Sequence, residues 1–220
     1  MCILNERNVW IDCEMTGLSL TDDALIEVAV LVTDAELNIL GEGVDVVIKP
    51  SSESVEQMDD FVTNMHKTSG LLEELDSGTT MEDAQEQVLA YIKEFVPEAR
   101  KAQLAGNSIG TDKTFLARDM PELIDYLHYR VIDVSTIKEL SRRWFPKALY
   151  NAPAKTGNHR ALGDIRDSID ELRYYRKAVF VEAPGPDSKQ AQAIAQEVVK
   201  TRQELQKCAR VCMVTTKISK

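Results

Sequence analysis

Two carboxylates stand two residues apart at the end of the first apolar segment, where Asp12 and Glu14 follow Val9–Ile11. That segment predicts a short buried strand, which ends in a turn at Thr16 and Gly17. Side chains of a strand alternate between its faces, so both carboxylates emerge on one side, about 7 Å apart. They repel each other unless a cation lies between them, and Mg²⁺ prefers such oxygen ligands. A strand that runs into solvent would also carry acids, and this pair alone does not separate the two interpretations.

Two further acids and a histidine could complete a site of this kind. Asp112 follows the loop Gly106–Gly110, where a predicted strand gives way to a helix, although an acid there also stabilises a helix N-terminus without any ligand. His159 and Asp164 stand at the start of a predicted long helix. On one helix these two would point about 140° apart, so they converge only if His159 precedes the first turn. Imidazole titrates near neutral pH, which suits this histidine to proton transfer.

The same helix offers a competing explanation for its acids. Asp164, Asp167 and Glu171 recur at helical spacing, which a solvent-exposed acidic face also produces. The pattern does not choose between Asp164 and Asp167 as a site residue.

Length, composition and charge limit the class of protein. The 220 residues fit one domain with a full core, and 44% hydrophobic and 28% charged residues are typical of a soluble globular protein. No apolar run approaches the roughly 20 residues that span a membrane. The four cysteines are scattered, so we expect free thiols in a reducing, cytoplasmic compartment. A net charge of −10 argues against a protein that coats long nucleic acid, but not against an enzyme that takes a few phosphates at a time.

Hydrophobic periodicity, helix caps and breakers predict the elements that must position these residues. Four further strands are expected after the first one, at 25–33, 44–48, 102–105 and 128–134. The expected helices run from the cap Thr80 to Pro97, from Asp112 to Leu116, from the cap Ser135 to Trp144, from His159 to Phe180 and over 190–210, with a loop at 146–157. Three strands followed by helices alternating with single strands predict an α/β fold with a mixed sheet flanked by helices.

This sequence resembles the DEDDh 3′-to-5′ exonucleases in three motifs: Asp12-x-Glu14, Asp112 in GNSIGTDKTFL, and His159 with Asp164 in HRALGDIRDSI. Further segments, among them WIDCEMTGL and HYRVIDVSTIKELSRRW, resemble the oligoribonuclease family nearly throughout residues 8–180. The resemblance implies a ribonuclease H-like fold, a homodimer, and hydrolysis of very short RNA oligonucleotides, chiefly dinucleotides, to mononucleotides. It leaves a mitochondrial form open beside a cytoplasmic one, because eukaryotic relatives include mitochondrial proteins.

The resemblance also implies roles for the acids and the histidine. Hydrolysis of a phosphodiester needs a water in line with the leaving oxygen and neutralisation of charge on the phosphate. Two divalent ions, Mg²⁺ or Mn²⁺, would supply that neutralisation. By resemblance their ligands are Asp12, Glu14, Asp112 and Asp164. His159 would be the general base that takes a proton from the attacking water.

Further positions resemble residues of the family that contact the substrate's bases. Leu18 and Phe61 match the apolar pair that sandwiches the bases, although core packing at helical spacing would also explain Phe61. Members of the family often have tryptophan in place of Phe61. His66 resembles a substrate-contacting histidine, and a capped loop histidine is the alternative.

A separate group of residues resembles the family's cap on the substrate's 5′ phosphate. In the family, the partner subunit contributes one residue to this cap. The matching positions are Ser108, Arg130 and Ser135, with Tyr129 contributed from the partner subunit of the homodimer. Such a cap would select short RNA, because a continuing chain loses the phosphate contact and meets a clash.

One departure from the family pattern concerns the last motif, where Gly163 precedes Asp164 and the family usually has two consecutive acids. The five-residue spacing of the family motif favours Asp164 as the ligand, and Gly163 then costs about 1 kcal/mol of helix stability relative to alanine. Two alternatives stay open: a broader exonuclease that acts on longer RNA or DNA, and a silent module that binds nucleotide ends. Retention of all four acids and the histidine argues against the silent module.

The sequence predicts an exonuclease domain over residues 1–182 and a linker with a basic, helical tail over 183–220. Residues 187–220 hold seven Lys or Arg and three Asp or Glu, so a positive tail follows an acidic body. A solvated helix face explains this tail, and a partner-binding or RNA-tethering helix is the alternative.

Overall fold

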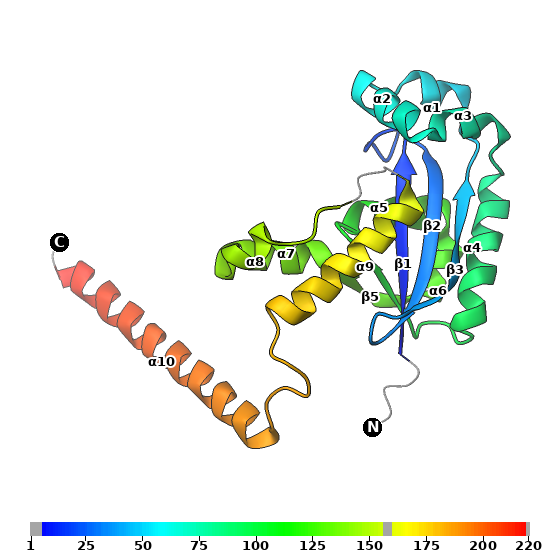
Figure 1. The fold of residues 1–220 in the computed structure, drawn as a ribbon. Coiled ribbons are helices and arrows are strands. Elements are labelled where there is room, and N and C mark those ends of the chain that lie inside the picture. Colours follow the sequence, from blue (N-terminus) through cyan, green and yellow to red (C-terminus); the bar gives the residue numbers. More distant parts are fainter. Residues whose placement is uncertain (1–5, 156–159, 219–220) are drawn as a thin grey trace. The chain divides into compact units, whose positions relative to one another are not determined.

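The computed structural model describes residues 6–155 and 160–218, and one five-stranded sheet forms its centre (Figure 1). The strands are β1 Arg7–Met15, β2 Leu25–Asp34, β3 Ile39–Val47, β4 Gln103–Gly106 and β5 His128–Asp133. They lie in the order β3-β2-β1-β4-β5. The first three strands are antiparallel, and β4 runs parallel to both β1 and β5. The predicted mixed sheet is therefore confirmed.

The third strand begins at Ile39, well before the start expected at residue 44. Gly41 and Gly43 have positive φ angles of 73° and 96°, and the register of the ladder to β2 shifts beside them. These glycines interrupt the alternation of apolar and polar side chains on which a strand prediction depends.

Helices cover both faces of this sheet. They are α1 Ser52–Glu56, α2 Asp60–Ser69, α3 Leu71–Glu74, the 3₁₀ helix η1 Leu75–Ser77, α4 Met81–Phe95, α5 Gly110–Asp119, α6 Pro121–Tyr126, α7 Val134–Trp144, α8 Pro146–Tyr150 and α9 Ala161–Ala178. Thr80 caps α4 as predicted, since its hydroxyl oxygen accepts the Asp83 N–H at 3.1 Å.

Two local predictions were wrong. The N-cap of α7 is Asp133 rather than Ser135, because the Asp133 carboxylate accepts the Ser135 N–H at 2.9 Å. The segment expected as a loop from residue 146 begins with α8, whose first residue, Pro146, already has the backbone angle that a helix requires. A helix of one turn has too few residues to show apolar periodicity, so the pattern did not reveal it.

Alternation along β1 divides the core between the two faces of the sheet. Ile11 packs on one face with residues of α4, α5 and α6. Trp10 points to the opposite face, where Ile165 of α9 joins the same cluster. Asp12 and Glu14 follow the alternation of Trp10, so they face α9.

The chain forms two compact units, Met1–Val179 and Phe180–Lys220. The second unit contains α10, Ser188–Ile218. Among the described helices, none combines the length and the apolar character needed to cross a bilayer.

Candidate active site

Three carboxylates meet beside the sheet. Asp12 and Glu14 come from β1, and Asp164 comes from the first turn of α9. One carboxylate oxygen of each residue lies within 4.8 Å of the other two. They meet because β1 turns both of its acids toward the face that α9 covers, and Ile165 packs the start of α9 onto that face. Of the two α9 acids that the pattern did not distinguish, Asp164 is the one in this group.

This group carries more negative charge than its surroundings compensate. Burial, and then nearby charge led by Asp112, raises the pKa of Asp12 to about 9. Burial and then the charge of Glu27 raise the pKa of Glu14 to about 8. Both shifts indicate that burial, together with the neighbouring acids, makes ionised carboxylates unfavourable here without a counter-ion. A partly buried set of oxygen donors with excess negative charge fits a divalent cation such as Mg²⁺ or Mn²⁺.

Asp112 lies in the first turn of α5 and is only 7% exposed. Its Oδ1 accepts the backbone N–H of Cys13 at 3.1 Å, which fastens it to the residue between the two acids of β1. The N-cap position of α5 belongs to Ile109, so Asp112 does not cap the helix. Burial is the main reason that its pKa rises to about 6. Asp112 thus adjoins the three-acid group from a third element.

His159 lies outside the described residues, but the chain beside it is held firmly. Arg160 is the extended N-cap of α9 and donates from Nε to Glu27 Oε1 at 2.8 Å. The other oxygen of Glu27 accepts the Ala161 N–H at 3.1 Å, and a second guanidinium nitrogen of Arg160 reaches Glu74 at 2.8 Å. These contacts fix the start of α9, the segment that carries the third acid.

The two apolar residues expected to sandwich the bases are both exposed. Leu18 is 77% exposed and Phe61 is 75% exposed, which excludes core packing as the explanation for Phe61. Leu18 projects from a loop that a carboxylate closes, since Asp23 accepts the Ser19 N–H at 2.8 Å. A Cβ at Gly17 would lie 2.4 Å from that carboxylate, so a larger residue there would displace the Asp23 side chain that closes the loop.

His66 is not the capped loop histidine of the alternative interpretation, because it belongs to a helix. It lies in the last turn of α2 and is fully buried. Its Nε2 lies 2.9 Å from the Met15 carbonyl oxygen, and its Nδ1 lies 4.0 Å from Glu14 Oε2. His66 therefore supports the end of β1 and stands directly behind one acid of the group.

The residues expected to cap the 5′ phosphate fall into two pairs. Ser108 and Ser135 are brought together by Asp133, whose Oδ1 accepts both backbone N–H groups, at 3.0 and 2.9 Å. Tyr129 and Arg130 are neighbours on β5, and the Arg130 guanidinium donates to the Tyr129 hydroxyl oxygen at 3.1 Å.

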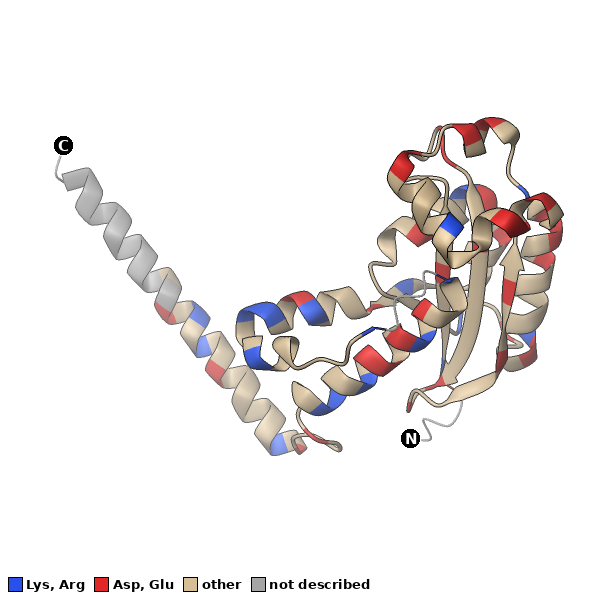
Figure 2. Ribbon diagram, turned by 45° about the horizontal axis from the view of Figure 1, so that its top comes forward, with Lys and Arg blue, Asp and Glu red and all other residues tan. Residues whose placement is uncertain are grey.

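Sequence reasoning missed Glu27, which holds Arg160 at the start of α9, and also Asp133 and Glu171, which hold the turn of Asn107 and Ser108. Glu27 had a signal, because it is a lone acid within the apolar strand LIEVAVLVT. Glu171 was grouped with an exposed acidic face, whereas it is only 6% exposed. Figure 2 shows that acidic residues dominate the helices of 52–95, while Lys and Arg recur on α7 and α9.

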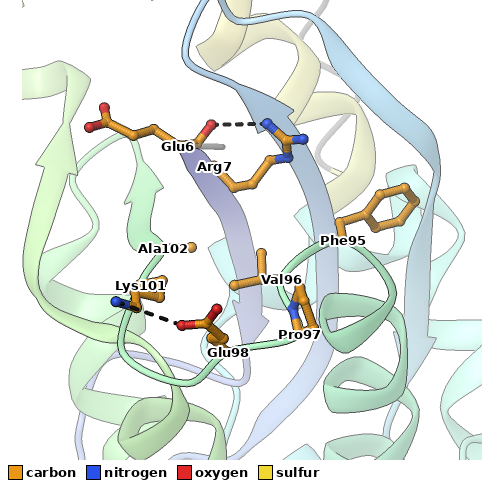
Figure 3. A pocket seen from close by; sticks show the side chains of 8 residues that line it. All are labelled: Glu6, Arg7, Phe95, Val96, Pro97, Glu98, Lys101 and Ala102. Atoms are coloured by element: carbon orange, nitrogen blue, oxygen red, sulfur yellow. Dashed lines mark hydrogen bonds and ion pairs between the residues drawn. The ribbon is translucent and has the colours of Figure 1, made fainter. Parts of the chain in front are cut away.

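A cleft of about 480 Å³ lies at the opposite end of β1, lined in part by Arg7, Phe95, Pro97 and Lys101 (Figure 3). Its charged pair, Lys101 with Glu98 at 3.7 Å, is largely exposed. None of its lining residues is a predicted site residue, so the carboxylate group and not this cleft is the candidate active site.

Comparison with known proteins shows the family to which the chain belongs. A family model described as exonuclease matches residues 9–172. The oligoribonuclease of Streptomyces griseus is 68% identical over 192 residues, which cover 87% of this chain and 96% of that protein. The oligoribonuclease of Cutibacterium acnes is 62% identical over 187 residues, covering 85% of this chain and 93% of that protein.

Solved structures show the fold. Exonuclease I from Methylocaldum szegediense matches 79% of this chain with a TM-score of 0.58 and 18% identity, and this chain spans 41% of it. Escherichia coli exonuclease I in complex with a dA16 oligonucleotide matches 79% of this chain with a TM-score of 0.62 and 14% identity, again over 41% of its length. The expected ribonuclease H-like architecture is thereby confirmed. The chain belongs to the oligoribonuclease family of 3′-to-5′ exonucleases.

Proposed function

We propose that this enzyme hydrolyses very short RNA oligonucleotides, chiefly dinucleotides, to nucleoside 5′-monophosphates, with two divalent ions, Mg²⁺ or Mn²⁺. The observation that carries the proposal is the group of Asp12, Glu14 and Asp164, whose carboxylate oxygens lie within 4.8 Å of one another. The names of the Streptomyces and Cutibacterium relatives support the substrate class.

The proposed roles of the acids follow from their placement. Asp12, Glu14 and Asp164 would jointly coordinate the ions. Asp112, whose carboxylate accepts the Cys13 N–H, would complete the ligand set. When bound, such ions neutralise charge on the phosphate and on the leaving oxygen. His159, adjacent to the anchored Arg160, would accept the proton of the attacking water.

Selection of short RNA would come from the exposed apolar pair and the phosphate cap. Leu18 and Phe61 offer exposed surfaces on which two bases can stack, and stacking tolerates any base sequence. Ser108 and Ser135, whose backbone N–H groups both donate to Asp133 Oδ1, would bind the terminal phosphate together with Arg130. A ligand with so few phosphates suits a protein with a net charge of −10.

The proposed homodimer brings Tyr129 of one subunit to the site of its partner. Tyr129 lies on the edge strand β5 and is 74% exposed, so a second copy can reach it. Its hydroxyl already accepts a hydrogen bond from Arg130, which would lie beside the phosphate of the same subunit.

A 5′-labelled RNA series from two to seven nucleotides, with Mn²⁺ or with EDTA, tests the proposal. We expect the dinucleotide to be hydrolysed fastest, EDTA to abolish turnover, and the Asp112→Ala variant to be inactive. Equal rates on the dinucleotide and the heptanucleotide would favour the broader exonuclease. Binding without any turnover in Mn²⁺ would favour the silent module.

The stabilisation that Mg²⁺ confers should increase with pH. Asp12 and Glu14 have folded-state pKa values of about 9 and 8, raised above those of the unfolded chain. Without metal, their protons therefore stabilise the fold fully at acidic pH, and this contribution is lost as pH rises through the folded values. Cations compete with the same protons, so the Mg²⁺-induced rise in Tm should be larger at about pH 9 than at about pH 6. Thermal melts with and without Mg²⁺ measure this. An equal rise at both pH values would contradict binding at these carboxylates, and Asp12→Asn should reduce the rise at both.

A further inference from the structure

Ser108 has a left-handed backbone conformation, with φ of 61°. This conformation is unfavourable for a residue with a Cβ unless the surroundings hold it. The Ser108 N–H donates to Asp133 Oδ1 at 3.0 Å. The side-chain amide of the preceding residue, Asn107, donates to Glu171 Oε2 at 2.7 Å. Two carboxylates from different elements, β5 and α9, therefore hold this turn at two successive residues.

Glu171 is the buried one of these carboxylates, with only 8% of its side chain exposed. A carboxylate in such a place requires charged or hydrogen-bonding partners. Besides Asn107 it has two ammonium groups, that of Lys138 at 3.5 Å and that of Lys155 at 3.9 Å. The lysine side chains are 46% and 41% exposed. One buried acid thus holds two cations where an anionic ligand can reach them.

The contacts close into a ring around the two serines. Lys138 follows Ser135 by three residues on α7, so their side chains share one face of the helix. The Ser135 hydroxyl donates to Asp133 Oδ1 at 2.6 Å, the same oxygen that binds the Ser108 N–H. On one side, Asp133 contacts Ser135 of α7, and Lys138 of the same helix contacts Glu171. On the other side, the turn of Asn107 and Ser108 connects Glu171 back to Asp133. Figure 2 shows that α7 is one of the basic elements of this unit.

Lys155 is the second cation that Glu171 holds, and it lies between α8 and α9 in the sequence. It also precedes His159 by four residues in the sequence. Glu171 therefore connects the serine turn with the segment that leads to the proposed general base.

We propose that Glu171 is a positioning residue for recognition of the substrate's terminal 5′ phosphate, and that it holds Lys138 and Lys155 as additional cations for that phosphate. The inference rests on the proposed function, because the phosphate cap belongs to it. The ligand group is a phosphate monoester at the 5′ end of a short oligonucleotide. The charge of Glu171 acts through Asn107 and the two lysines, without touching the substrate.

Two substrates test this role: a dinucleotide with a 5′ phosphate and the same dinucleotide with a 5′ hydroxyl group. Glu171→Gln preserves shape and removes the charge. For the 5′-phosphorylated substrate we expect kcat/KM to fall by about 10- to 100-fold, mainly through KM, because charge-assisted contacts are lost. For the 5′-hydroxyl substrate we expect a change below about threefold. Asp170→Asn is the matched control on the same helix, since Asp170 is 62% exposed in an ordinary pair with Arg173, and it should change neither value.

Equal losses on both substrates, or no loss on either, would overturn the inference. If circular dichroism shows that Glu171→Gln does not fold, the same two substrates are compared with the Lys138→Gln variant instead. A reduced preference for the 5′-phosphorylated substrate then supports the inference, and an unchanged preference overturns it. The ratio of dinucleotide to heptanucleotide rates in the unmodified enzyme tests the proposed function separately, so the two failures are distinguishable.

Discussion

Asp164→Asn is expected to reduce dinucleotide hydrolysis by at least about 10²-fold, whereas Asp167→Asn should leave the rate within about threefold. Both residues are aspartates on the same helix, and the sequence pattern ranked them equally. Only Asp164 belongs to the group whose oxygens lie within 4.8 Å of one another. Asparagine keeps the size of the side chain and one oxygen but removes the charge that the proposed ions require.

The comparison has a readout that does not depend on turnover. Because Asp164 is a proposed ligand, its asparagine variant should lose most of the Tm increase that Mg²⁺ produces, while the Asp167 variant keeps it. Circular dichroism establishes that both variants are folded. Full activity of Asp164→Asn, or loss of activity in Asp167→Asn alone, would show that α9 presents a different acid to the substrate.

His159→Ala is expected to lower kcat by about 10²- to 10⁴-fold, the usual contribution of a positioned general base. The next residue, Arg160, donates from Nε to the fully buried carboxylate of Glu27 at 2.8 Å. The residue that follows His159 in the chain is therefore held in place. The defect should lie in kcat, because proton transfer belongs to the chemical step and not to substrate binding.

Two measurements distinguish a general base from a metal ligand at this position. The Mg²⁺-induced rise in Tm should persist in His159→Ala and disappear in Asp164→Asn. In the unmodified enzyme, kcat should fall as the imidazole becomes protonated below neutral pH, and the alanine variant should lack this dependence. Retention of the acidic decline in the variant would assign it to another group.

Local pattern was sufficient for much of the fold. Alternation along β1 correctly placed Asp12 and Glu14 on one side with Trp10, because the two-residue period of a strand depends only on its own backbone. The apolar run that became β2 is buried almost throughout, and the hydroxyl of Thr80 begins α4 as expected. These features depend on neighbours within a few residues, which the sequence displays directly.

The arrangement of the site depended on contacts between distant segments. Asp112 binds the N–H of Cys13 across 99 positions, and Arg160 reaches Glu27 across 133. No local pattern encodes such pairs, because loop closure and packing bring them together and their energy depends on burial.

Burial also decided which charged residues act as supports. Glu171 and Asp167 are both acids of one helical stripe in the sequence. In the structure, however, Glu171 Oε2 accepts a hydrogen bond from the Asn107 side-chain amide at 2.7 Å. Contact of His66 with the substrate stays a prediction, and the structure shows the side chain fully buried, with its Nδ1 4.0 Å from Glu14 Oε2. Residue type and spacing therefore identified the chemistry, whereas the packing of α9 and α2 on the sheet selected the acids that meet and the residues that hold them. The physical reason is that a side chain's charge and contacts depend on the solvent and the segments around it, and folding alone brings these together.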